Sequence, residues 1–245
     1  MNRLPSRARP SPGFTLTELA VVLVVVALVL GGLLSPLATQ MDVRMTAETR
    51  KDLADIREAL LGFAVINGRL PCPAAATIAS GVAGAGLEAA LVGDNCPNAS
   101  GVVPWVTLGV PETDAWGQRY SYRVTPAFAQ RVTAPRSAAF DLATPGTLDV
   151  RSAAVGGTMV AGGLPVVVIS HGANGRGGYN RAGVQLPSGE VVDEIDNQLT
   201  NAGTAMANTV FVSRARNPGS GFDDEVSWVP RAILVSRLIG VGKLP

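Results

Sequence analysis

The sequence predicts an α+β protein in which one long amino-terminal helix packs on an antiparallel β-sheet head. Two observations support this: an apolar run continues directly into an amphipathic helical segment, and the chain after residue 69 carries short β-type runs between Gly- and Pro-rich stretches. The 245 residues suffice for this helix and one globular domain, with a second small subdomain possible. The formal net charge of +1 gives no overall attraction to nucleic acid, so no nucleic-acid partner is predicted.

The apolar run, residues 14–36, is predicted to be the transmembrane half of the helix. From 14 to 34 its only ionisable residue is Glu18. At 1.5 Å per residue, this run is about 31 Å long, close to the thickness of a bilayer's hydrocarbon core. A charge inside a membrane helix costs about 3 kcal/mol, so we expect Glu18 to have a functional partner.

The segment before this run, residues 1–13, reads as a basic leader. It contains Arg3, Arg7 and Arg9 and no acidic residue. By the positive-inside rule, the amino terminus stays in the cytoplasm and everything after about residue 36 is exported.

The order Gly13-Phe14-Thr15-Leu16-Thr17-Glu18, followed by a long apolar helix, resembles the class III signal of type IV pilins and type II secretion pseudopilins. The resemblance implies that a prepilin peptidase cleaves between Gly13 and Phe14 and methylates the new amino terminus of Phe14. It also implies that Glu18 pairs with the Phe14 amine of a neighbouring subunit during filament assembly.

The same resemblance implies a pilin-like fold and a non-enzymatic structural role in a type IV pilus-like filament or a type II secretion pseudopilus. The size of the head favours a minor pilin or pseudopilin. The partners would be prepilin peptidase, other pilin or pseudopilin subunits and the inner membrane, which the helix crosses once with the head in the periplasm.

Three other interpretations of the amino terminus stay open. An ordinary secretory signal peptide has a shorter apolar region and a small-residue cleavage site, which Pro36-Leu37-Ala38 matches poorly. A generic single-pass anchor leaves Glu18 and the Gly13-Phe14 junction unexplained. A membrane-anchored periplasmic binding or adhesion domain with a pilin-like amino terminus would require a concave pocket within residues 100–230.

Residues 37–68 are predicted to be the amphipathic half of the same helix. One face carries the apolar side chains Leu53, Ile56, Leu60, Phe63 and Ala64. Asn67-Gly68 provides a carboxy-terminal stop, and a kink is expected at Gly31-Gly32 or Pro36.

The head is predicted to extend over residues 69–245 and to contain one disulfide bond. Cys72 and Cys96 are the only cysteines, and export places them in an oxidising compartment. A bond between them would close the loop 72–96. Two free thiols or half of a metal site are the alternatives.

Strands are expected at 102–103, 105–108, 118–124, 137–142, 147–150, 166–170 and 209–213. A short helix is possible at 87–92, and residues 231–239 fit a helix after Pro230 or a final strand. The stretch from Asp114 to Val124 resembles a turn and strand of major pseudopilins, with Ala115 in place of a proline. We expect Trp116, Tyr120 and Tyr122 to pack the sheet against the amphipathic helix.

Catalysis and metal binding have weak support in the sequence. The only histidine, His171, follows Ser170, and adjacent strand residues point to opposite faces, so the pair does not form a nucleophile and its base. One histidine and a disulfide also argue against zinc. No cofactor is therefore predicted, except that calcium is possible, with Asp223 and Asp224 as candidate ligands. The calcium hypothesis rests on the oxygen donors that this ion prefers and on the resemblance, because major pseudopilins bind calcium in a carboxy-terminal loop.

Two acidic groups supply such oxygens, and the alternative is that both are solvated turn carboxylates. Their members are Asp193, Glu194 and Asp196, and Asp223, Asp224 and Glu225.

Overall fold

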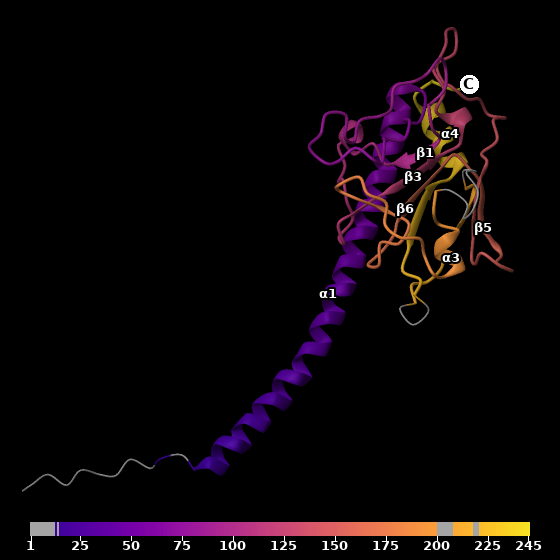
Figure 1. Cartoon of the computed structure of the whole chain (residues 1–245). Coiled ribbons are helices and arrows are strands. Elements are labelled where there is room, and N and C mark those ends of the chain that lie inside the picture. Colours follow the sequence, from indigo (N-terminus) through magenta and orange to yellow (C-terminus); the bar gives the residue numbers. More distant parts are fainter. Residues whose placement is uncertain (1–12, 14, 200–207, 218–220) are drawn as a thin grey trace, which may run out of the picture. The chain divides into compact units, whose positions relative to one another are not determined.

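The computed structural model describes residues 13, 15–199, 208–217 and 221–245, without the side chains of residues 30–38. The chain divides into two compact units, residues 1–44 and 45–245, which are described separately. The α+β prediction is confirmed: an amino-terminal helix is followed by a head with an antiparallel β-sheet (Figure 1). The elements are α1 (Leu16–Asn67), β1 (Ser100–Val102), α2 (Trp105–Leu108), β2 (Gln118–Arg119), β3 (Ser121–Val124), η1 (Pro126–Phe128), β4 (Leu148–Arg151), β5 (Met159–Leu164), β6 (Val166–Ser170), β7 (Tyr179–Asn180), α3 (Val192–Ile195), β8 (Val210–Val212), β9 (Glu225–Val229) and α4 (Arg231–Gly240).

The first unit contains the beginning of α1, which is helical through Gly31, Gly32 and Pro36. Its large apolar side chains between residues 16 and 29 are exposed around the helix. Within the described part of the chain, no helix has both the length and the apolar character needed to cross a bilayer. The predicted leader 1–12, Phe14 and the side chains of residues 30–36 lie outside the described residues.

The second unit is built around the last part of α1. Leu53, Ile56, Leu60 and Ala64 are buried in one apolar cluster, as their helical spacing predicts. Phe63, expected on the same face, is half-buried outside this cluster and lies under the Arg69 guanidinium. The helix ends at Asn67, and Gly68 then takes a φ of 69° with its N–H donated to the Ala64 carbonyl. This left-handed residue turns the chain into the head.

The main sheet packs against this part of α1 in the strand order β1-β3-β6-β9, with every pair antiparallel. Alternation along the strands gives the sheet two faces. Tyr122 and Val168, which are register partners, belong to the cluster that contains Leu60, and α4 contributes Leu234 and Leu238 to the same cluster. We call this cluster the helix-facing core. In Figure 1, β1, β3 and β6 lie beside the upper part of α1.

The opposite face of the sheet has a smaller core of its own. Val167 and Ile169 from β6 join Leu148, Val150 and Phe211. These last three residues belong to a second sheet with the order β5-β4-β8. Its β4–β8 pair is parallel, in contrast to the antiparallel pairs of the main sheet.

Three of the predicted elements are wrong. Residues 105–108 form the short helix α2, because Pro104 starts a turn in which Leu108 donates to the Pro104 carbonyl. Residues 137–142 form no strand, since the Asp141 side chain closes a local turn with Thr144. Residues 87–92 form no helix, because the Glu88 carboxylate is held by the N–H of Cys72 and by Arg69.

The aromatic prediction is correct for two of its three residues. Tyr120 and Tyr122 are fully buried in the helix-facing core, and their hydroxyls donate to Asp52 and to the Pro71 carbonyl. Trp116 lies outside that core and stacks on the Arg216 guanidinium instead. Of the two alternatives for residues 231–239, the structure shows the helix, α4.

Candidate functional site

The amino-terminal motif forms a capping box at the start of α1. The Glu18 carboxylate accepts hydrogen bonds from the Thr15 N–H and the Thr15 hydroxyl, both at 2.9 Å, and the Glu18 N–H donates back to the Thr15 hydroxyl at 3.3 Å. This reciprocal pair satisfies two of the free N–H groups at a helix start. Glu18 is exposed, so its carboxylate also remains accessible to a second partner.

The predicted cysteine pair is joined in the structure. A disulfide bond links Cys72 and Cys96, with 5.4 Å between their Cα atoms. Cys72 is fully buried, and Cys96 packs against the helix-facing core. The bond ties the loop that follows α1 to the side of the head that packs on the helix.

A second group of functional residues comes together at one end of the sheet. His171 directly follows β6, Glu194 lies in α3, and Asp223 and Asp224 directly precede β9. We call these four side chains the polar cluster. Pairing of β6 with β9 places Ser170 opposite Glu225, which brings His171 and Asp224 to the same edge.

The polar cluster is closely spaced and excluded from water. One carboxylate oxygen from each of Glu194, Asp223 and Asp224 lies within 4.8 Å of the others. The His171 Nδ1 atom is 3.9 Å from an Asp224 oxygen, and His171 itself is 0 % exposed. Glu194 is 1 % exposed, and the two aspartates are 6 % and 3 % exposed.

Burial shifts every pKa in the polar cluster toward the neutral form of the group. The pKa of each carboxylate is raised, mainly because desolvation disfavours the charged form. Desolvation lowers the pKa of His171 to about 4, and a weaker contact with the Arg176 main chain, outside hydrogen-bond geometry, acts in the opposite direction. The Arg216 guanidinium is 4.0 Å from Asp223, and the charge of Arg176 acts against the raised pKa of Glu194.

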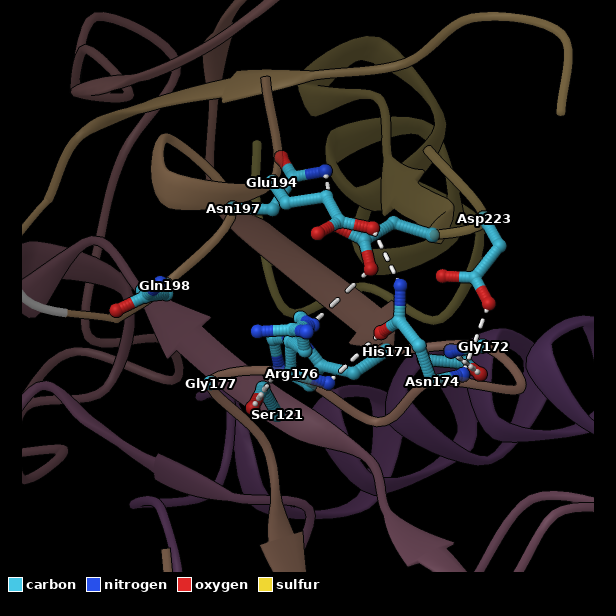
Figure 2. Close-up of polar contacts among 12 residues, drawn as sticks. Ser121, His171, Gly172, Asn174, Arg176, Gly177, Glu194, Asn197, Gln198 and Asp223 are labelled. Atoms are coloured by element: carbon cyan, nitrogen blue, oxygen red, sulfur yellow. Dashed lines mark hydrogen bonds and ion pairs between the residues drawn. The ribbon is translucent and has the colours of Figure 1, made fainter. Parts of the chain in front are cut away.

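Residues next to the polar cluster form a hydrogen bond with one atom of each of its side chains (Figure 2). The Asn174 side chain donates to Glu194 at 2.7 Å, and the Asn174 N–H donates to Asp223 at 2.9 Å. Asn197 donates to Asp224 at 2.8 Å. The Ser121 hydroxyl lies 2.8 Å from the His171 Nε2 atom.

The glycine-rich loop after β6 makes this packing possible. Gly172 has a φ of 61°, and a Cβ atom at this position would lie 2.4 Å from the Asp223 carbonyl oxygen and 2.7 Å from an oxygen of its carboxylate. A side chain at residue 172 would therefore collide with the polar cluster.

The sequence contains two acidic groups, and the polar cluster includes carboxylates from both. Glu194 joins Asp223 and Asp224, whereas Asp193 pairs with Arg214 and Glu225 pairs with Arg50. The solvated-turn interpretation is thus wrong for Asp223 and Asp224. Sequence reasoning missed His171 and Glu194 as their partners, since nothing in the local pattern marks contacts between segments so far apart.

The side chains of Ser170 and His171 have different partners. Ser170 donates to Asp114 at 2.6 Å, while His171 contacts Ser121. Ser121, His171 and Asp224 do follow the order of a catalytic triad. Ser121 is 1 % exposed, however, which gives a substrate no access to its hydroxyl.

A pocket of about 540 Å³ lies elsewhere on the head, between the loop 73–77 and residues 97–101. The Arg123 side chain lines it and donates to the Ser100 hydroxyl and the Asn208 carbonyl. Its lining is mixed, with polar groups from Asn98, Tyr179 and Gln185 beside alanine and proline side chains.

Comparison with known proteins identifies the amino terminus. Residues 9–34 match the model of the prokaryotic N-terminal methylation motif, which is the signature of type IV pilins and pseudopilins. No curated protein and no solved structure is significantly similar to the chain.

Proposed function

We propose that this pilin-like protein is a structural subunit of a type IV pilus-like filament or a type II secretion pseudopilus, anchored in the inner membrane until it assembles. The observation that carries the proposal is the apolar surface at the start of α1. Side chains that include Leu19, Leu23 and Leu28 are exposed there, on the same helix whose later residues form the core of the head. Such a surface needs a lipid or protein partner.

Maturation follows from the methylation motif. A prepilin peptidase would cleave between Gly13 and Phe14 and methylate the Phe14 amine, leaving the head in the periplasm. The head, from residue 69 onward, is larger than expected for a compact major subunit, which supports a minor pilin or pseudopilin. The role is structural, and the motif supports no enzymatic activity.

In this proposal Glu18 has two roles. Its capping box starts the helix, and its negative charge pairs with the Phe14 amine of a neighbouring subunit. The substitution Glu18→Gln separates these roles, because a glutamine at the third helical position keeps a capping box but carries no charge. Glu18→Ala removes both.

We expect both variants to insert in the membrane and both to lose filament assembly, measured by shearing, sedimentation and immunoblotting of the assembled fraction. Glu48→Ala removes an exposed carboxylate farther along the same helix and should assemble normally. Normal assembly of Glu18→Gln would contradict charge pairing. Mass spectrometry of the mature protein tests the first step, where an intact Met1 would contradict processing and an N-methylated Phe14 would support it.

A second candidate function is ligand binding or adhesion by a membrane-anchored head. The pocket beside Arg123 favours it, because a buried guanidinium in the wall of a pocket is suited to hold an anionic group. Ligand binding by the head does not depend on Glu18, so the same variants distinguish the two functions.

A further inference from the structure

The polar cluster has the donor set of a metal site. We propose that His171, Glu194, Asp223 and Asp224 together bind one divalent first-row transition-metal ion, with Zn²⁺ and Mn²⁺ as the cations that suit one imidazole nitrogen and three carboxylates. This inference does not depend on the proposed role in a filament.

The first argument is which atoms are left free. Among the described residues, the His171 Nδ1 atom, one Asp223 oxygen and one Asp224 oxygen have no hydrogen-bond partner although they are fully buried. A buried polar atom without a partner destabilises the folded state. Three such atoms in one cluster therefore indicate a common partner that binds all of them.

The second argument is how the other atoms of the same side chains are held. Ser121 contacts His171 through Nε2, which leaves Nδ1 free. Asn197 occupies one Asp224 oxygen and the Asn174 main chain occupies one Asp223 oxygen, which again leaves the second oxygen free. Metal ligands typically show this arrangement, in which an outer group orients the side chain and the remaining atom binds the ion.

The third argument is charge. Three buried carboxylates face one another, while the Arg216 guanidinium is 4.0 Å from Asp223 and the charge of Arg176 acts on Glu194. Among the described residues, the carboxylates of the polar cluster therefore outnumber the guanidinium groups that act on them. A divalent ion supplies the missing positive charge, and it binds the deprotonated carboxylates and the neutral imidazole.

The donor set favours a transition-metal ion over calcium. The ligand atoms of a tetrahedral Zn²⁺ lie about 3.4 Å apart, given bond lengths of about 2.0–2.2 Å. The three carboxylate oxygens lie within 4.8 Å of one another and the His171 Nδ1 atom is 3.9 Å from an Asp224 oxygen, so the side chains must close in on the ion as it binds. Calcium, which the sequence suggested for Asp223 and Asp224, takes six to eight oxygen ligands, and the imidazole nitrogen would occupy one of those positions.

The single histidine permits a direct test. The full-length chain is produced without a histidine tag, labelled with ¹⁵N-histidine, stripped of metal with a chelator in detergent micelles, and titrated with ZnCl₂. Every imidazole signal then comes from His171. We expect one Zn²⁺ per chain and a shift of the Nδ1 resonance larger than that of Nε2.

A matched pair of variants controls for general effects on the fold. Glu194→Gln removes one proposed ligand, while Glu190→Gln makes the same change four residues earlier at an exposed carboxylate that pairs with Arg176. By isothermal titration calorimetry, Zn²⁺ affinity should fall about tenfold or more in the first variant and stay unchanged in the second. Thermal unfolding confirms that each variant is folded before it is titrated.

Three outcomes would overturn the proposal. The first is the absence of stoichiometric Zn²⁺ or Mn²⁺ binding by the metal-free chain. The second is an Nδ1 resonance that does not respond to bound Zn²⁺, a result that needs no variant. The third is tighter binding of Ca²⁺ than of Zn²⁺ in parallel titrations, which would indicate a site made of oxygen atoms alone.

Discussion

The helix-facing core and the polar cluster are both buried in the head, but they are built from opposite chemistry. In the helix-facing core, Leu60, Tyr122 and Val168 contact other apolar groups, and the tyrosine hydroxyl has its own acceptor. In the polar cluster, His171, Asp223 and Asp224 each keep a buried atom that has no partner among the residues the structure describes. The first region stabilises the fold by burial, whereas the second is stable only if something compensates its buried charge.

The comparison shows how to distinguish a structural core from a site. In the helix-facing core, the burial of apolar surface and the hydrogen bonds of the tyrosine hydroxyls account for the position of each residue. The polar cluster remains unexplained by folding alone, because burying acidic groups works against stability. Three experiments test this difference, and they follow in order of expected effect.

The largest effect is expected from Leu60→Ala in the helix-facing core. Leu60 is fully buried, so the change should lower the free energy of unfolding by about 2–5 kcal/mol through lost burial and a remaining cavity. Urea unfolding followed by tryptophan fluorescence measures it, since all three tryptophans lie in the head. Ile66→Ala, on the same helix but 75 % exposed, should change the stability by less than about 0.5 kcal/mol. Equal effects would contradict the assigned packing.

A smaller effect is expected from Gly172→Ala, beside the polar cluster. Gly156→Ala is the control, because Gly156 has a similar φ of 68° but open space around its Cβ position. The added methyl group at residue 172 should destabilise the protein by about 1–3 kcal/mol more than the control, since it must displace Asp223. The same unfolding measurement applies. A difference near zero would mean that the loop moves freely, contrary to a rigid polar cluster.

The smallest effect is expected from the ion pair that joins α1 to β9, next to the polar cluster. Arg50 and Glu225 approach to 2.8 Å, but the Arg50 side chain is 61 % exposed. A double-mutant cycle with Arg50→Ala and Glu225→Ala should give a coupling energy of about 0.2–1 kcal/mol, reduced at high salt. A coupling above about 2 kcal/mol would show that this pair belongs with the buried charges.

Regular hydrophobic patterns account for the parts of the fold that the sequence predicted. The spacing of Leu53, Ile56 and Leu60 identified the buried face of α1, and the apolar run at 166–170 identified β6. The hydrophobic pattern gave wrong secondary structure where hydrogen bonds of side chains or turns determine the backbone conformation. The prediction of a strand at 105–108 overlooked the turn at Pro104, and the prediction at 137–142 overlooked the side chain of Asp141.

The candidate site was only half visible in the sequence. Asp223 and Asp224 were singled out by their composition, but the pairing of β6 with β9 is what brings them to His171. The sequence contains a single histidine, and for that reason a zinc site was not predicted. Only the three-dimensional arrangement shows that its free nitrogen faces a carboxylate.

By itself, the sequence determined the methylation motif at residues 9–34, the long helix and its apolar face, because these depend on residue order and on helical periodicity. The tertiary structure decided that four side chains from three separate segments form the polar cluster. The physical reason is that contacts between distant segments depend on strand pairing and on turn geometry, which no local pattern specifies.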